Sequence, residues 1–517
     1  MTELYLDRLA RTINENWNAP ALTDFYLTED GTVQDTSRGN HYTYGEMYME
    51  MLRLTELFKE LGLQKGDHIA ICGANSSHWA IAYLAIATYQ GVSVTILHTQ
   101  SPEDIACQID FSDAKVLFTD EVIWEEIRTF LQRDNVSKLS YIISLADWSH
   151  IFSRPIESIQ SAMIKDTTSV QGQCQISHRK LDDLAMICFT SGSAGVSKGV
   201  MLSYRNVSNN VGQSYSLYPL TSNKHYLSFL PYAHMAGLIG DVLSHLVLAR
   251  HLHILRGTSF VKYIKNVYDL ISPYMIVCVP DLFRLVFTQK QTGRLLLDNN
   301  CGLIFMGGAK LDSTIEQNII ASGIPLSMIY GQTETGASIS ISPYGQHRIA
   351  SSGKIVEGMI ARIADNGEIL VKGENVMLGY YKNPEATAKK IDKNGWLHTG
   401  DKGYLDEDGY LYVEGRLEQD MIVLPNGENI HPDNIECKIN ALSDVTESIV
   451  IARDGKLIAI VIPNKEIAIE DRKTLRLSIL KSVNAQLPFY AQLYDIEWSE
   501  EPLARTAKQT IKRYLYK

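Results

Sequence analysis

Residues 184–200, with the sequence LAMICFTSGSAGVSKGV, place glycines and hydroxyl side chains directly after an apolar run. The run Leu184–Phe189 predicts a buried strand, and we expect an amphipathic helix after the loop. Glycines let backbone N–H groups converge on an anion, hydroxyls add donors, and Lys198 neutralises negative charge. Such a loop between a strand and a helix indicates a phosphate-binding site.

Two familiar loop types do not fit this segment. A P-loop requires Gly-Lys followed by Ser or Thr, whereas the order here is Ser197-Lys198-Gly199. The segment also lacks the Gly-x-Ser-x-Gly pattern of a hydrolase nucleophile elbow. Taken alone, it leaves a Gly/Ser surface loop open as the alternative to a phosphate site.

The elements that must position this loop alternate between strands and helices. The apolar pattern predicts helices over 44–62 and 79–88, separated by a strand over 69–72. This alternation implies βαβ units and a mostly parallel sheet, and it recurs around 184–215 and 274–306. The predicted fold class is α/β, with a large N-terminal region of several subdomains.

From about residue 341 the sequence changes to short strand-like runs separated by turn pairs. Three Asn-Gly or Asp-Gly pairs predict an antiparallel sheet or a small barrel over 361–415. The last section alternates short apolar strands with helices and predicts a small, mobile α+β domain. We expect residues 1–416 to form the large N-terminal domain and residues 417–517 a C-terminal lid domain.

The composition excludes several classes of protein. The 517 residues carry 59 acidic and 48 basic side chains, and the net charge of −11 argues against a general nucleic-acid binder. The seven cysteines are widely spaced and include no Cys-x-x-Cys pair, which fits a reducing cytosol. No apolar stretch reaches the ~20 residues of a membrane span, and the first residues show no signal peptide. The sequence therefore predicts a cytoplasmic protein.

The loop also resembles a known signature. Thr190–Val200, T-S-G-S-A-G-V-S-K-G-V, is similar to (S/T)-S-G-(S/T)-T-G-x-P-K-G-V of the adenylate-forming superfamily, and departs from it at Ala194 and Ser197. That superfamily contains acyl- and aryl-CoA ligases, luciferases and peptide-synthetase adenylation domains. Further segments resemble it in the same order, over residues 42–517: 231–237 (PYAHMAG), 306–309 (MGGA), 330–334 (YGQTE), 367–387, 396–409 and 427–436.

The resemblance implies a reaction with two half-reactions. A carboxylic acid attacks the α-phosphate of ATP to give acyl-AMP and pyrophosphate, and a thiol then displaces AMP. ATP, Mg²⁺ and CoA are the implied cofactors, and an acyl-carrier protein is the alternative thiol acceptor. Because two anions must meet, catalysis rests on positioning and electrostatic stabilisation.

The same resemblance assigns the phosphate side of the site. The β- and γ-phosphates would be held by Ser191, Gly192, Ser193, Gly195 and Lys198. Glu334 and Thr190 would act in catalysis as Mg²⁺ ligands, because Mg²⁺ takes carboxylate and phosphate oxygens. Thr333 would donate to the α-phosphate, whereas the alternative for Glu334 is a solvated turn residue.

The adenosine side is assigned in the same way. The purine would lie against Gly308, Ala309, Tyr330 and Gly331. Asp401 would accept the ribose hydroxyls, and Arg416 would bond ribose and phosphate. Judged without their neighbours, Tyr330 reads more readily as a core aromatic, Asp401 as a turn cap and Arg416 as a surface ion pair.

His234, in PYAHMAG, would gate the acyl pocket or the thiol channel, and a buried structural histidine is the alternative. Peptide-synthetase adenylation domains usually place an Asp near this segment to bind the substrate amine. No Asp occurs in 230–240, and Asp241 follows Gly240 at a spacing that looks wrong. This favours an uncharged acyl or aryl tail.

The chain departs from the family pattern at its C-terminus. Aligned with P-R-T-x-x-G-K-I-x-R, the catalytic lysine position holds Thr510, whose hydroxyl supplies no charge. Lys508 and Lys512, each two residues away, are the candidate replacements. The hinge segment is one residue longer than G-R-x-K-D-x-I, and Asp420 is the candidate pivot.

Three hypotheses remain from the sequence. The first is an acyl-CoA ligase for a medium- or long-chain fatty acid, supported by the segment 424–429, which resembles long-chain ligases. The second is an acyl-AMP ligase that loads a separate carrier protein. The third, motivated by Thr510 and Ala194, is a family member that binds nucleotide or acyl-adenylate without turnover.

Overall fold

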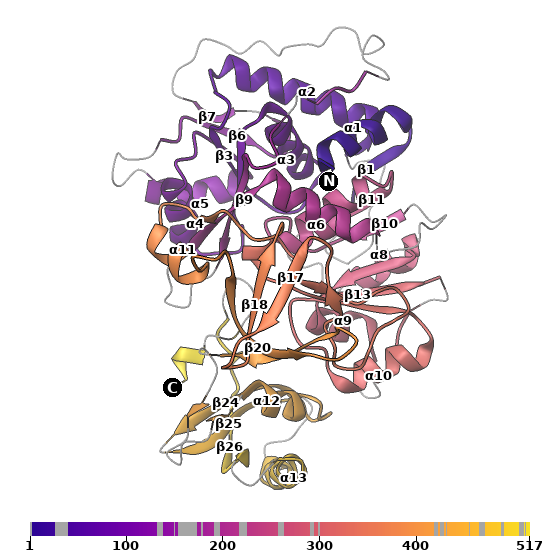
Figure 1. Cartoon of the computed structure of the whole chain (residues 1–517), viewed down its shortest axis with the longest axis vertical. Coiled ribbons are helices and arrows are strands. Elements are labelled where there is room, and N and C mark those ends of the chain that lie inside the picture. The colour runs from indigo at the N-terminus through magenta and orange to yellow at the C-terminus, as the bar shows by residue number, and fades with distance from the viewer. Residues whose placement is uncertain are drawn as a thin grey trace.

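The computed structural model is a mixed α/β structure of several sheets with a C-terminal domain (Figure 1). The described residues are 3–25, 40–131, 138–148, 150–153, 173–176, 179–190, 197–216, 225–256, 263–289, 294–297, 300–417, 422–423, 429–430, 432–453, 455–464, 471–487, 491–505, 511 and 513–516. Within these ranges, no helix has the length and apolar character needed to cross a membrane.

An eight-stranded sheet in the order β19-β9-β8-β4-β3-β5-β6-β7 lies at the centre of the first part of the chain. Its strands are β3 (His68–Cys72), β4 (Val92–Thr95), β5 (Val116–Thr119), β6 (Tyr141–Ser144), β7 (His150–Ser153), β8 (Leu184–Thr190), β9 (Lys198–Ser203) and β19 (Gly379–Tyr380). The inner strands β8, β4, β3, β5 and β6 run parallel, as the strand–helix alternation predicted.

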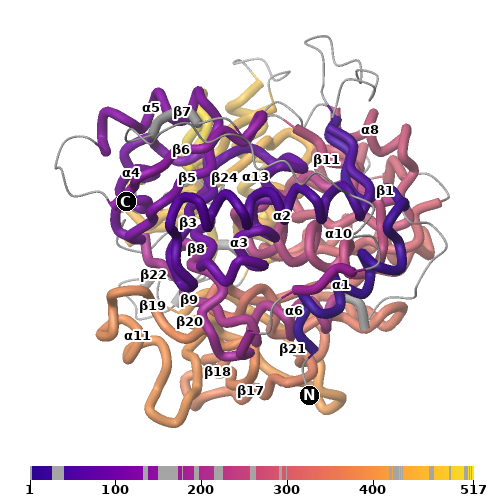
Figure 2. The backbone as a smooth tube through the Cα atoms, turned by 90° about the horizontal axis from the view of Figure 1, so that it is seen from above, coloured from indigo at the N-terminus to yellow at the C-terminus, as the bar shows by residue number. Residues whose placement is uncertain are grey.

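Helices cover both faces of this sheet, with α2 and α3 in one core and α4 and α5 in the other. Figure 2 looks onto α2 and α3. The helices of this region are α1 (Tyr5–Glu15), α2 (Tyr44–Glu60), α3 (Ser77–Tyr89), α4 (Pro102–Phe111), α5 (Glu121–Leu131) and α6 (Tyr204–Ser216). Strand β3 alternates between the two sides: Ile69 and Ile71 join the core with α2 and α3, whereas Ala70 and Cys72 join the core with α4 and α5. Because both faces are buried, the strands read as continuous apolar runs.

Two further sheets follow. The first has the order β10-β11-β1-β2, and the second has the order β12-β13-β14-β15-β16. Their strands are β1 (Pro20–Phe25), β2 (His41–Thr43), β10 (His225–Ser228), β11 (His251–Leu255), β12 (Met275–Cys278), β13 (Leu303–Gly307), β14 (Leu326–Tyr330), β15 (Ser340–Ile341) and β16 (Lys354–Ile355). The helices of this part are α7 (Ser244–Leu246), α8 (Ile264–Ile271), α9 (Pro280–Phe287) and α10 (Ser313–Ser322).

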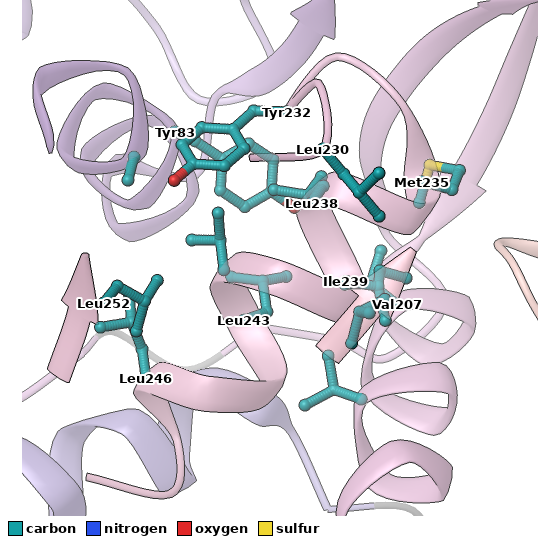
Figure 3. Packing of buried hydrophobic residues seen from close by; sticks show 14 of the residues in the cluster. Tyr83, Val207, Leu230, Tyr232, Met235, Leu238, Ile239, Leu243, Leu246 and Leu252 are labelled. Carbon is teal, nitrogen blue, oxygen red and sulfur yellow. The ribbon is translucent and has the colours of Figure 1, made fainter. Parts of the chain in front are cut away.

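Between β10 and β11 the chain forms a π-helix over Ala236–Leu243. Leu238 and Ile239 on this helix pack with Val207 of α6 in the apolar cluster of Figure 3. A π-helix of this length is rare, and π-helical turns are frequent at functional sites. The segment that the sequence assigned to the acyl pocket therefore runs directly into an unusual helix.

The region 359–416 forms a four-stranded antiparallel sheet in the order β17-β18-β20-β21, where the sequence predicted a sheet or a small barrel. Its elements are β17 (Met359–Ile363), β18 (Glu368–Gly373), α11 (Pro384–Lys390), β20 (Leu397–Leu405) and β21 (Leu411–Arg416). The turn glycines Gly367, Gly395 and Gly409 all have φ of 80–83°, a conformation that glycine adopts readily.

The C-terminal elements lie at the end of the long axis beyond β20, opposite α2 (Figure 1). They are β22 (Ile422–Val423), β23 (Asn429–Ile430), α12 (Pro432–Asn440), β24 (Val445–Arg453), β25 (Lys456–Pro463), α13 (Arg472–Asn484) and β26 (Asp495–Trp498). One face of the sheet β24-β25-β26 buries a core with α12 and α13, and Ile449 and Ile458 on the other face pack with Leu503. These two cores hold no residue of the N-terminal sheets.

Candidate active site

Strands β8 and β9 pair in antiparallel fashion and place Thr190 opposite Lys198. Residues 191–196 between them, which include the predicted phosphate ligands Ser191, Gly192, Ser193 and Gly195, lie outside the described residues. The prediction of a helix directly after this loop was wrong, because the loop leads into β9 and α6 begins only at Tyr204. Residues 198–203 instead complete the hydrogen-bonded ladder with β8. The N-terminus of α6 is therefore separated from Lys198 by the length of β9.

Lys198 connects the phosphate loop to the segment that carries Glu334. Its ammonium lies 5.1 Å from the centre of the Tyr380 ring, and the Tyr380 hydroxyl donates to Glu334 Oε1 at 2.8 Å. Burial and the neighbouring Glu334 carboxylate both raise the pKa of Tyr380, so this hydroxyl stays protonated. Thr190 pairs with Lys198, and Tyr380 links Lys198 to Glu334, so these residues form one connected group.

The side-chain oxygens of Glu334 and Thr190 fit the Mg²⁺ ion that the resemblance implied. Mg²⁺ binds through one or two carboxylates together with phosphate oxygens. The Glu334 carboxylate is half-buried, the Thr190 side chain is buried, and a cation that could hold phosphates lies beside them. All the offered donor atoms are hard oxygens.

Asp401 has only 7% of its side chain exposed and lies in a dense set of hydrogen bonds. Tyr330 donates its hydroxyl to Oδ2 at 2.6 Å, and Gln332 Nε2 donates to the same oxygen at 2.7 Å. The Arg416 guanidinium lies 3.0 Å from Oδ1, because β20 and β21 pair Asp401 with Arg416 in register. Tyr330 and Arg416, both predicted for the adenosine side, therefore contact the same carboxylate as Gln332, which follows Tyr330 closely in the chain.

The adenine residues lie at neighbouring strand ends. β13 and β14 run parallel, and Gly307 pairs with Ile329, so Gly308–Ala309 and Tyr330–Gly331 emerge at the same sheet edge. Ligands of α/β proteins bind at such carboxyl ends. Gly331 is required by packing, because a Cβ atom there would lie 1.7 Å from the carbonyl oxygen of Ala337.

The sequence assigned the Tyr330 ring to stacking on adenine, which stays a prediction, and the structure shows a contact of its hydroxyl. Its hydroxyl is committed to Asp401, and burial together with that carboxylate holds the pKa of Tyr330 well above its usual value. Thr333 begins the short 3₁₀ helix Thr333–Thr335, which Gln332 caps. The buried Gln332 Oε1 has no hydrogen-bond partner among the described residues, which leaves it able to accept a bond from a ligand.

Gln332, Tyr380 and Lys390 are residues that sequence reasoning did not single out. The first two stand inside the matched segments YGQTE and GYY, so their signal was present in the motifs. Lys390, the last residue of α11, carried no such signal. Together with Lys198 and Tyr380 it lines an open pocket of about 340 Å³.

His234 lies in a turn just before the π-helix, and its backbone N–H donates to the carbonyl oxygen of Pro231 at 3.0 Å. Asp241, on that helix, is fully buried and accepts hydrogen bonds from Tyr226 and Ser228 side chains and from the N–H groups of Phe229 and Leu230. Its carboxylate therefore holds the end of β10 in place. This supports the interpretation that Asp241 is not an amine-binding residue.

The basic C-terminal tail is less open than its sequence suggests. Arg513 forms ion pairs with Glu436, and Arg505 pairs with Glu447. An antiparallel bridge joins Arg505 to Ile511, so the tail folds back on its own domain. The hinge candidate Asp420 and the positions Lys508, Thr510 and Lys512 lie outside the described residues.

Comparison with known families identifies this arrangement. A sequence model of the AMP-binding enzyme family matches residues 9–381, and a model of the AMP-binding enzyme C-terminal domain matches residues 419–516. The chain belongs to the AMP-binding enzyme family. The resemblance to adenylate-forming enzymes inferred from the motifs is thereby confirmed.

Two similar proteins illustrate the range of relatives. The chain is 28% identical over 432 residues to 2-succinylbenzoate–CoA ligase of Oceanobacillus iheyensis, which covers 82% of this chain and 83% of that protein. It is 27% identical over 445 residues to long-chain-fatty-acid–CoA ligase FadD15 of Mycobacterium bovis, which covers 76% of this chain and 72% of that protein. Both names are those of CoA ligases, and their acids differ.

A solved structure agrees on the fold. O-succinylbenzoate coenzyme A synthetase (MenE) from Bacillus subtilis, in complex with ATP and magnesium ion, superposes with a TM-score of 0.76 at 22% identity. The match covers 98% of this chain and 98% of that chain. This AMP-binding enzyme therefore has the fold of an adenylate-forming ligase along nearly its whole length.

Proposed function

We propose that this AMP-binding enzyme activates a carboxylic acid with ATP and transfers the acyl group from acyl-AMP to CoA. The observation that carries the proposal is the arrangement of two groups of residues: the Asp401 carboxylate stands near the buried Gln332 Oε1, and Lys198 stands near Glu334. One group of residues suits a ribose and the other suits phosphates. Both are needed to bind ATP in a defined orientation.

The proposed roles follow from the chemistry of each side chain. Asp401 accepts the ribose hydroxyls, Arg416 fixes that carboxylate, and the ends of β13 and β14 hold adenine. The loop residues Ser191, Gly192, Ser193 and Gly195, with Lys198, hold the β- and γ-phosphates. Glu334 and Thr190 would hold Mg²⁺, which supplies charge neutralisation to the phosphate oxygens when bound. Thr333 donates to the α-phosphate.

The proposed acid is a medium- or long-chain fatty acid. Asp241 is committed to β10, so no carboxylate on this part of the π-helix would bind a substrate amine. The surrounding helix is lined by apolar residues, and one relative carries a name for long-chain fatty acids. His234 would gate this acyl pocket or the thiol channel.

For the C-terminal part, we propose that residues 417–517 act as a lid that turns about Asp420 between the half-reactions, with the domain boundary after Arg416. Lys508 or Lys512 would bring positive charge to the acyl phosphate in place of Thr510. Full-length Lys508→Ala and Lys512→Ala variants test this proposal. Loss of acid-dependent pyrophosphate release in one of them identifies the residue, and full activity in both excludes the pair.

The decisive experiment measures pyrophosphate release from Mg-ATP in the presence of a panel of acids, from octanoate to palmitate, with 2-succinylbenzoate as the contrasting acid. We expect release with the fatty acids and acyl-CoA formation when CoA is added. Acyl transfer only to an added acyl-carrier protein would indicate an acyl-AMP ligase. ATP binding by calorimetry without pyrophosphate release from any acid would show a binding protein and overturn the proposal.

A further inference from the structure

Away from the nucleotide site, three histidines gather on one face of the sheet β10-β11-β1-β2. His251 and His253 stand two residues apart on β11, so their side chains point to the same face. His225 on β10 pairs in register with His251. One ring nitrogen from each of the three lies within 4.8 Å of the other two.

The two inner histidines are suited to act as ligands. Metal ions bind the unprotonated ring nitrogens of histidine. Among the described residues, the buried Nδ1 atoms of His251 and His253 have no hydrogen-bond partner. A buried nitrogen lone pair without a partner is uncommon.

Neighbouring groups fix the orientation of these rings. His251 Nε2 lies 2.7 Å from Thr23 Oγ1, and His253 Nε2 lies 2.9 Å from His225 Nδ1. The ring centres of His251 and His253 are 4.0 Å apart. The Thr23 contact holds the second ring nitrogen of His251 in the way that is usual for metal-binding histidines.

We propose that His225, His251 and His253 bind one divalent transition-metal ion, with Zn²⁺ as the best match. Imidazole nitrogens suit zinc, copper and nickel, whereas Mg²⁺ prefers oxygen ligands. Three protein ligands leave a further position for water. The ion joins β10 to β11, the two strands that flank the π-helix, and so fixes the segment beside the proposed acyl pocket.

The test titrates Co²⁺ and Zn²⁺ into full-length protein from which any affinity tag has been removed. We expect one ion per chain, a visible Co²⁺ absorption band that Zn²⁺ abolishes, and a higher melting temperature with Zn²⁺. His225→Ala changes an exposed ligand and should keep the fold. It should weaken Zn²⁺ binding by more than the ~10–100-fold that loss of an outer partner costs.

His68→Gln, a half-buried histidine on β3, is the matched control and should leave Zn²⁺ affinity unchanged. Nucleotide binding by each variant, measured in parallel, reports that the fold is intact. Absence of the Co²⁺ band, or equal Zn²⁺ affinity in His225→Ala, would overturn the site.

A second inference concerns Lys390, and it rests on the proposed function. Its ammonium donates to the carbonyl oxygen of Thr399 at 3.1 Å, the same oxygen that Gln332 Nε2 contacts at 2.8 Å. On the other side, Lys390 shares an open pocket with Lys198. The lysine therefore lies between the residues proposed for ribose and those proposed for the terminal phosphates.

The electrostatics agree with this position. Burial lowers the pKa of Lys390, while the nearby Glu334 and Asp401 carboxylates oppose that shift. A lysine partly removed from water and facing an anionic ligand gains more from each new charge contact than an exposed one. In ATP, the α-phosphate joins the ribose to the β- and γ-phosphates, so it must pass between Asp401 and Lys198.

The geometry points to Lys390 as a cation that contacts the α-phosphate of ATP. Lys390 adds positive charge from the N-terminal region to the charge that Lys508 or Lys512 is proposed to bring from the C-terminal tail.

The test compares full-length Lys390→Gln and Lys390→Arg with Lys393→Ala, an exposed lysine on the next turn. We expect Lys390→Gln to weaken ATP binding ~10–100-fold and adenosine binding little, because charged hydrogen bonds to phosphate are lost. Lys390→Arg should restore part of the ATP affinity, and Lys393→Ala should match wild type.

Binding and turnover separate the two proposals. If wild type binds ATP but releases no pyrophosphate with any acid, the proposed function fails. The ratio of ATP affinities between wild type and Lys390→Gln still tests the role of Lys390 in that case. If Lys390→Gln binds ATP as tightly as wild type, the role of Lys390 is overturned even where the enzyme is active.

Discussion

Two regions of the N-terminal part each bury an aspartate, and their surroundings differ. Asp401 lies on the inner strand β20, and Arg416, Tyr330 and Gln332 contact its carboxylate. Asp241 lies on the π-helix, fully buried, and accepts hydrogen bonds from neutral hydroxyl and N–H donors of the β10 region. One carboxylate has a cationic neighbour and stands near a pocket, and the other has neutral donors in a closed core.

This difference separates a structural role of a buried carboxylate from a ligand-binding role. Burial raises the pKa of Asp241 to about 7, although four donors oppose that shift. Neutral hydroxyl and N–H donors hold the end of β10 against the Asp241 carboxyl group without requiring that group to be charged. The Asp401 carboxylate instead lies 3.0 Å from the Arg416 guanidinium, at the position proposed for the ribose. We therefore expect Asp401 variants to lose function and Asp241 variants to lose stability.

The largest expected effect is on Asp401. Asp401→Ala removes both ribose acceptors and leaves the half-exposed Arg416 without its partner. We expect kcat/KM for ATP to fall about 1,000-fold, which corresponds to two charged hydrogen bonds. Asp365→Ala, an exposed aspartate on the turn of the same sheet, is the control. ATP affinity within threefold of wild type in Asp401→Ala would contradict the assignment.

Asp241→Ala should act on stability instead. It leaves the Tyr226 hydroxyl and the Phe229 and Leu230 N–H groups buried without an acceptor. We expect the free energy of unfolding to fall by about 3 kcal/mol in urea titrations. At a temperature where the variant is folded, KM for ATP should equal that of wild type. The exposed Asp281→Ala gives the baseline for an aspartate substitution.

The pH dependence sharpens this difference. The pKa of Asp241 is about 7 in the fold and near the ordinary 3.8 in the unfolded chain, so the fold holds the extra proton between these values. Its contribution to the free energy of unfolding therefore falls as pH rises from about 4 to about 7, and is constant above. Urea titrations at several pH values should show a smaller decrease in Asp241→Asn. Equal slopes in the two proteins would argue against a protonated Asp241.

The smallest effects compare two tyrosines that donate to these carboxylates. Tyr330→Phe removes one donor from Asp401 and should lower kcat/KM for ATP about 10-fold, with little change in stability. Tyr226→Phe removes one donor from Asp241 and should lower the free energy of unfolding by about 1 kcal/mol without changing ATP affinity. The reverse pattern would show that the two aspartates do not differ in role.

Much of the fold could be predicted from local patterns. The helices over 44–62 and 79–88 and the strand over 69–72 correspond to α2, α3 and β3, because periodicity and turn residues agree along those segments. The helix expected after the phosphate loop was wrong, because residues 198–203 pair with β8. That strand is specified by its partner, and a local pattern does not show the partner.

The sequence by itself determined the family and the order of its motifs, since T-S-G-S-A-G-V-S-K-G-V and the later segments are contiguous runs of residues. Only the tertiary structure decided how residues far apart share one site. It joined Tyr330 to Asp401, placed Lys390 in the pocket of Lys198, and committed Asp241 to β10. Hydrogen bonds and burial are set by neighbours in space, which a linear spacing of residues does not contain.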